Sequence, residues 1–172
     1  MIPMADTPDY ITFGASMLAA RRVARPAPRS SDTVVDHSAF APVLDDLADR
    51  GIGSLPGNVE RLVRYRASLA ALSPDDLSPA ESLAYWVNLY NAGALLAASE
   101  ALAAGASSVL RLPNAFGRRD VTVDDEALSL DDIEHGKIRR YGDPRIHAAL
   151  VCGSVSCPTL RFEPYRGADL DD

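Results

Sequence analysis

Residues 78–96, SPAESLAYWVNLYNAGALL, decide the fold of this chain. They begin with a capping box, in which the Ser78 hydroxyl can accept a hydrogen bond from the Glu81 amide. The Glu81 side chain can in turn reach back to the Ser78 amide. Pro79 suits the first helical position, because its missing N–H would have no partner there in any case. The sequence therefore predicts a helix that starts at Pro79.

This helix is expected to run to about Ala104 and to be closed by Gly105. Its side chains are apolar on nearly every face. A helix without a polar face is usually buried on most sides. We therefore expect it to form the centre of the domain.

Asn88 and Asn91 interrupt the apolar pattern and share a helix face, because they are three residues apart. Burying a carboxamide without partners costs about 1–3 kcal/mol. Two interpretations are open. The two side chains tie neighbouring loops to the helix by hydrogen bonds, or one of them orients a catalytic imidazole.

Shorter elements are expected on both sides of the central helix. Upstream, apolar residues at helical spacing predict helices over 39–49 and 58–72. Downstream, two short apolar stretches around Asp124-Asp125-Glu126 predict a hairpin. Ser129 and Asp132 form a second capping signal, so we expect a helix over 130–140.

The apolar run over 146–151, IHAALV, has the length of a strand and predicts a core strand. The expected fold class is therefore α+β. It is a helix-rich single domain with a central buried helix over about 79–104 and a small β-sheet that includes strand 146–151. Residues 1–31 are expected to form a separate N-terminal segment and linker, and residues 32–172 the domain.

The composition excludes some classes of protein. The 172 residues correspond to one domain, and 17 basic against 24 acidic side chains give a net charge of −7. This charge argues against nucleic-acid binding, which needs a dense basic face. No stretch is long and apolar enough to predict a transmembrane helix. The N-terminus lacks the basic-then-apolar order of a secretory signal, so we expect a cytoplasmic protein with mostly reduced thiols.

Three blocks of the sequence are similar to the DUF547 family. They cover residues 85–92, 128–136, and 143–154 together with Cys157-Pro158. The resemblance spans roughly residues 34–172. It implies a fold and a set of motifs but no reaction, because the family is named for having no established function. Its members often continue with a further helical stretch, so the resemblance implies a domain that ends early at its C-terminus.

The reactive side chains are concentrated near the loop over 152–158, CGSVSCP. The predicted strand leads directly into this loop, and a loop of small residues that leaves a buried strand is a common place for an active site. One hypothesis is a thiol hydrolase or acyl transferase, with Cys157 as nucleophile and His135 as base. His147 is the alternative base, and Cys152 is the second thiol.

Several neighbours could support this chemistry. Asn88 or Asn91 could orient the imidazole of His135. Asp131 lies four residues before His135 on the same helix face, whereas the adjacent Glu134 points about 100° away. Backbone amides over 153–156, including that of Ser154, could stabilise an oxyanion.

Two other interpretations stay open. His135, His147, Cys152 and Cys157 would suit tetrahedral zinc, although their spacing is unusual for a zinc site. Alternatively, these residues are structural, and the domain binds or scaffolds without catalysis. A disulfide between the two cysteines is a minor variant that the cytoplasm disfavours. We expect no other cofactor, and a small molecule or peptide as ligand; the sequence does not decide between a protein partner and self-association.

Overall fold

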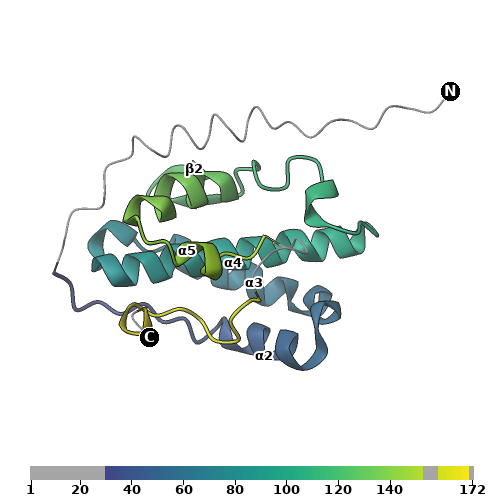
Figure 1. The fold of residues 1–172 in the computed structure, drawn as a ribbon, viewed down its shortest axis with the longest axis horizontal. Coiled ribbons are helices and arrows are strands. Elements are labelled where there is room, and N and C mark those ends of the chain that lie inside the picture. Colours follow the sequence, from purple (N-terminus) through teal and green to yellow (C-terminus); the bar gives the residue numbers. More distant parts are fainter. Residues whose placement is uncertain (1–29, 153–158, 171–172) are drawn as a thin grey trace.

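A computed structural model describes residues 30–152 and 159–170 of the chain. Its longest element is α4 (Pro79–Ala103), which matches the helix expected over about 79–104. α4 crosses the middle of the molecule (Figure 1), and most of its side chains are buried. The prediction of a central buried helix is therefore confirmed. The predicted segment 1–31 lies almost entirely outside the described residues, so its boundary stays a prediction.

The start of α4 confirms one half of the predicted capping box. Ser78 Oγ accepts a hydrogen bond from the Glu81 amide at 3.3 Å. The buried Glu81 carboxylate is used differently: it accepts from the amides of Val35, at 3.3 Å, and Gly167, at 3.1 Å. The first turn of α4 therefore holds segments from near both ends of the described chain.

Two helices lie on one side of α4, the nearer one packed on α4 and the other packed on the nearer one (Figure 1). They are α2 (Ala41–Arg50) and α3 (Leu55–Ala70), joined by the 3-10 turn η1 (Ile52–Ser54). α3 makes the most extensive contact with α4, and the Tyr85 hydroxyl fixes it by donating to the Leu69 carbonyl at 3.0 Å. Both helices were expected from the sequence.

The hairpin is also confirmed. β1 (Val121–Val123) and β2 (Glu126–Leu128) pair antiparallel. The turn residues Asp124 and Asp125 have φ angles of 48° and 63°. Positive φ at both central positions is what a type I′ turn needs, and Asp tolerates this conformation better than most residues. Among the described residues, these two strands make up the whole sheet.

The segment over 130–140 is helical, but most of it is not an α-helix. η4 (Asp132–Lys137) is a π-helical turn, and η5 (Ile138–Tyr141) continues as a 3-10 helix. The predicted capping signal is present, because the Asp132 amide donates to Ser129 Oγ at 3.1 Å and the Ser129 amide donates to the Asp132 carboxylate at 3.0 Å. π turns are often found at functional sites.

The predicted strand over 146–151 is wrong, because its first four residues form the short helix α5 (Ile146–Ala149). Asp143 starts the turn by accepting a backbone N–H two residues further on. The buried apolar residues are Ile146 and Leu150, which are four apart, as on a helix face. The predicted fold class, a helix-rich α+β domain, is confirmed. The sheet of the described residues is smaller than expected, because the segment over 146–151 is not part of it.

Short 3-10 turns connect the remaining segments. They are η2 (Pro74–Asp76) before α4, η3 (Val109–Arg111) after it, and η6 (Gly167–Asp169) near the C-terminus. Within residues 30–152 and 159–170, no helix has both the length and the apolar character needed to cross a membrane.

Candidate functional site

Asn88 and Asn91 are fully buried on α4, and each holds a distant segment by a pair of hydrogen bonds. Asn88 donates to the Tyr165 carbonyl at 2.7 Å and accepts from the Tyr165 amide at 3.0 Å. Asn91 donates to the Ala149 carbonyl at 2.9 Å and accepts from the Val151 amide at 3.1 Å. The structure thus shows both carboxamides tying loops to the helix, while the orientation of an imidazole stays a prediction.

The two segments held in this way form the walls of a groove of about 620 Å³. α5 makes one wall and the C-terminal segment over 159–170 makes the other. The floor is apolar and comes from Leu83 and Val87, one helical turn apart on α4. Pockets that bind small molecules in proteins have volumes of about 300–1,000 Å³, largely apolar linings and a few polar groups. The groove has the size and floor of such a site.

The polar groups of the groove include two arginines. Arg145 donates to both Asp143, at 2.8 Å, and the Leu170 carbonyl. The guanidinium carbon of Arg161 lies 5.5 Å from the centre of the Tyr165 ring. The carboxylates of Asp143 and Asp169 also line the groove, so its charged groups are two arginines and two aspartates.

The predicted cysteine loop over 152–158 lies between the two walls of the groove in the sequence. The chain leaves the first wall at Val151 and enters the described part of the second wall at Thr159. Two of the predicted site residues, Ser154 and Cys157, lie outside the described residues. Cys152 is half-buried and disulfide-bonded, and the described residues contain no free cysteine.

His135 is buried on the π turn η4. Its Nδ1 lies 3.9 Å from the Glu134 carboxylate, which also accepts from the Tyr90 hydroxyl at 3.1 Å and from Arg139 at 2.8 Å. Burial raises the pKa of the Asp131 carboxyl above its ordinary value, and the nearby His135 opposes this rise. Both acidic residues that were considered as partners of His135 are therefore close to it.

The structure describes part of the predicted site. Asn91 contacts the residue before Cys152. His135 lies 3.9 Å from Glu134 and is near enough to Asp131 to affect the pKa of its carboxyl. His147 is exposed on α5, and it is not one of the α5 side chains that line the groove.

The predicted zinc set includes Cys157, which lies outside the described residues. Within the described ranges, no group of three or more His, Cys, Asp or Glu side chains could hold a metal ion. The zinc interpretation therefore stays a prediction.

No local pattern in the sequence points to the groove itself. Tyr165 lies 77 residues from Asn88, and nothing in either neighbourhood links them. The one signal that could have led to the groove is the pair of buried asparagines, each of which had to have a partner somewhere.

Comparison with known proteins gives one match. No curated protein and no solved structure is significantly similar to the chain. The model of the family described as "Protein of unknown function, DUF547" matches residues 74–172, which include α4, the π turn, α5 and the cysteine loop. This match covers more than half of the chain, and the chain therefore belongs to the DUF547 family.

Proposed function

We propose that this domain binds a small molecule or short peptide in the groove between α4, α5 and residues 159–170. We further propose that the cysteine loop acts on this ligand as a thiol-dependent hydrolase or acyl transferase. The observation that carries the proposal is the double anchoring by Asn88 and Asn91. These side chains fix the chain on both sides of the predicted cysteine loop, which supports the proposal that one of its thiols acts on a ligand in the groove.

The lining of the groove indicates the kind of ligand. Leu83 and Val87 offer an apolar floor for an acyl chain. The two arginines and two aspartates of the lining favour a ligand that also carries hydrogen-bonding groups such as carbonyl oxygens. An acyl compound with a polar end satisfies both requirements.

The proposed reaction begins with the reduction of the disulfide at Cys152 by a cellular thiol, in keeping with a cytoplasmic location. A thiolate of the loop, with Cys157 as the proposed nucleophile, attacks the carbonyl carbon of the ligand. A carbon–sulfur bond forms, and the bond to the leaving group breaks. His135 first accepts the thiol proton and then gives it to the leaving group. Water finally hydrolyses the thioester and restores the thiol.

Labelling of the reduced protein with iodoacetamide at a series of pH values tests the thiol part. An activated thiol reacts well below pH 8, whereas an ordinary one follows its pKa of about 8.5. Cys157→Ser should abolish the low-pH reaction and Cys152→Ser should not. His135→Gln should shift the profile towards that of an ordinary thiol, and His147→Gln, at an exposed site, should leave it unchanged. An ordinary profile for both cysteines would overturn the thiol mechanism.

A second experiment tests the groove. p-Nitrophenyl butyrate should acylate the reduced protein and release a burst of nitrophenolate. Ala148→Trp places a large side chain at an exposed position that lines the groove, and should reduce the burst. His147→Trp is the matched control on the same helix, because His147 does not line the groove. Equal bursts from both variants would show that the groove is not the acyl site.

The competing function is a binding domain without catalysis. The disulfide at Cys152 favours it, because a sulfur in a disulfide is not a nucleophile. In that case the protein shows ordinary thiols and no burst. Metal analysis of protein purified without chelator tests the zinc variant of this function: stoichiometric zinc supports it, and folded, metal-free protein rejects it.

A further inference from the structure

A second cavity, of about 350 Å³, has Ser82 and Trp86 of α4 in its lining, and we call it the Trp86 cavity. Its other walls come from η2, the hairpin and the η4–η5 segment. None of its lining residues also lines the groove. It is therefore a separate site, and ligand binding in it does not depend on the proposed thiol chemistry.

The walls of the Trp86 cavity are tied to one another by side-chain hydrogen bonds. The Tyr141 hydroxyl donates to Ser82 Oγ at 2.7 Å, which attaches η5 to α4. The Ser73 hydroxyl donates to the Asp124 carboxylate at 3.0 Å, which attaches the hairpin turn to the residue before η2. The cavity is therefore bounded by elements that are fixed relative to one another.

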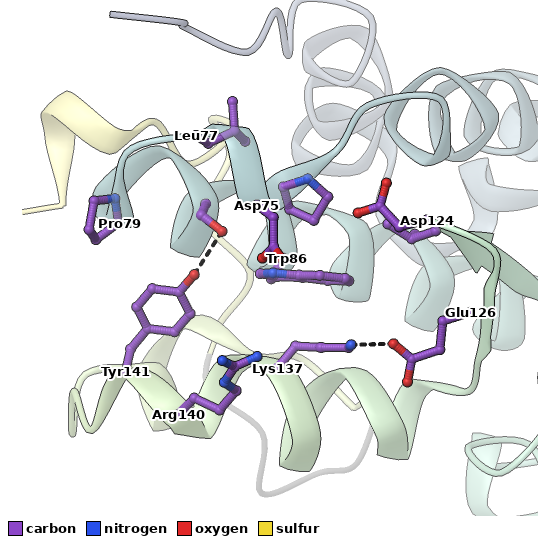
Figure 2. Close-up of a pocket in the computed structure, with 12 residues that line it drawn as sticks. Asp75, Leu77, Pro79, Trp86, Asp124, Glu126, Lys137, Arg140 and Tyr141 are labelled. Atoms are coloured by element: carbon purple, nitrogen blue, oxygen red, sulfur yellow. Dashed lines mark hydrogen bonds and ion pairs between the residues drawn. The ribbon is translucent and has the colours of Figure 1, made fainter. Parts of the chain in front are cut away.

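The charged groups of the cavity are of both signs and lie among one another. Figure 2 shows the acidic Asp75 next to Trp86 and the basic Lys137 running below the same ring. Lys137 in turn forms an ion pair with Glu126. A charged ligand of either sign therefore has a group of like charge among its neighbours, which is unfavourable. This arrangement favours a neutral ligand.

The face of the Trp86 ring is not available as a stacking platform. The Lys137 ammonium lies 5.6 Å from the ring centre, a distance at which a cation is attracted to the indole face. A ligand in the cavity is therefore held by hydrogen bonds, with Trp86 as a neighbour that senses its arrival.

The hairpin side of the cavity has hydrogen-bonding capacity to spare. Among the described residues, the side chains of Asp124 and Glu126 each accept one side-chain hydrogen bond, from Ser73 and from Lys137. A carboxylate has about four lone-pair sites and an ammonium has three N–H donors. Acceptors and a donor therefore remain side by side at this corner of the cavity.

We propose that the Trp86 cavity binds a neutral molecule with several hydroxyl groups, such as a single sugar ring or a cyclic polyol. One hydroxyl donates to Asp124 or Glu126, and an adjacent hydroxyl accepts from the Lys137 ammonium. A hydroxyl both donates and accepts through one oxygen, so two neighbouring hydroxyls satisfy both kinds of group at once. Hydrogen bonds to charged partners are about twice as strong as those between neutral groups.

The volume and the apolar part of the lining indicate the size of the ligand. Sites for small molecules have volumes of about 300–1,000 Å³, and this cavity lies at the lower end of the range. It therefore suits one ring better than a chain of rings. Leu77 and Val123 offer apolar surface for the C–H groups of such a ring.

Tryptophan fluorescence gives a direct test, because Trp86 is the only tryptophan of the chain. The neutral probes are glucose, galactose, glycerol and myo-inositol. Glucuronate and glucosamine are the charged analogues of glucose, and cyclohexanol is the analogue of inositol with a single hydroxyl. Glucose, galactose or inositol should bind about tenfold more tightly than its analogues, since one charge-assisted hydrogen bond is worth about that factor.

Three variants remove one hydrogen-bonding group each. Asp124→Asn keeps a residue that tolerates positive φ, so the turn should stay intact. Glu126→Gln and Lys137→Met remove the charges of the ion pair. Lys137→Met and at least one of the two carboxylate variants should weaken binding of the neutral probe about tenfold. Arg64→Gln, in an exposed pair on α3, is the matched control and should bind as wild type does.

Three results would overturn the proposal. The first is equal or tighter binding of the charged analogues. The second is no change in fluorescence and no heat in calorimetry with every neutral probe at millimolar concentration. The third is polyol binding that survives all three cavity variants but is lost in Ala148→Phe, because this variant narrows the groove instead. Thermal melts establish that any loss of binding occurs in folded protein.

Discussion

The groove has Leu83 and Val87 of α4 in its lining, and the second cavity of about 350 Å³, the Trp86 cavity (Figure 2), has Ser82 and Trp86 of the same helix. The walls of these two sites are held in different ways. Buried carboxamides bind the backbone of the groove walls, through Asn88 and Asn91. Partly exposed side chains hold the cavity, through pairs such as that of Lys137 with Glu126. Neutral buried hydrogen bonds are little affected by salt, whereas exposed ion pairs are weak and screened. One helix therefore supports a rigid site and a more adaptable one.

The largest effect is expected from Asn91→Ala. It leaves the Val151 amide and the Ala149 carbonyl without their partner, at about 2 kcal/mol each, so unfolding free energy should fall by about 4 kcal/mol. Urea unfolding at neutral pH measures this loss. A loss below about 1 kcal/mol would contradict the claim that carboxamides hold the groove.

The stability of the domain should depend on pH through His37. His37 is buried against Tyr65, with its Nδ1 2.6 Å from the hydroxyl, and lies close enough to Arg166 of the second groove wall to sense its charge. Burial lowers the pKa of His37 from 6.5 to about 4. As the pH falls, His37 is therefore protonated in the unfolded chain before it is protonated in the folded protein.

The sign of the effect is set by this order of protonation. The contribution of His37 to stability is complete above pH 6.5 and is lost as the pH falls towards 4, by about 3 kcal/mol in total. His37→Gln should flatten this part of the stability profile, as measured by urea unfolding between pH 4 and 7. A profile that keeps its slope in the variant would assign the titration to other groups.

The smallest effect is expected from Lys137→Met. Its ion pair is partly exposed, with 57% of the Glu126 side chain accessible, so the loss should stay below about 1 kcal/mol. This loss should shrink further in about 1 M salt. Arg64→Met, in a fully exposed pair, is the matched control. A loss as large as that of Asn91→Ala would remove the distinction between the two sites.

The elements that were predicted correctly depend on local signals. The caps at Ser78 and Ser129, and the Asp124-Asp125 turn, act over three or four residues, which a single sequence displays directly. The run over 146–151 was assigned wrongly because a short apolar stretch fits the period of a strand and of a helix. The first four residues of this run form the helix α5, and Asp143 accepts a backbone hydrogen bond in the turn that leads into this helix.

The candidate site was harder to predict than the fold. The sequence identified Asn88 and Asn91 as unusual, but their partners lie 58 to 77 residues away and carry no recognisable pattern. Glu134 was considered the poorer partner of His135 on the geometry of an α-helix, and the structure has a π turn there instead. The second cavity is lined by residues from separate elements and so could not be anticipated.

Hydrogen exchange at two backbone amides tests the central claim most directly. In the wild type, the amides of Val151 and Tyr165 should exchange slowly, because each donates to a buried carboxamide. Asn91→Ala should accelerate exchange at Val151 and spare Tyr165, and Asn88→Ala should do the reverse. Fast exchange at both amides in the wild type would contradict the claim, because the two groove walls would then not be anchored to α4.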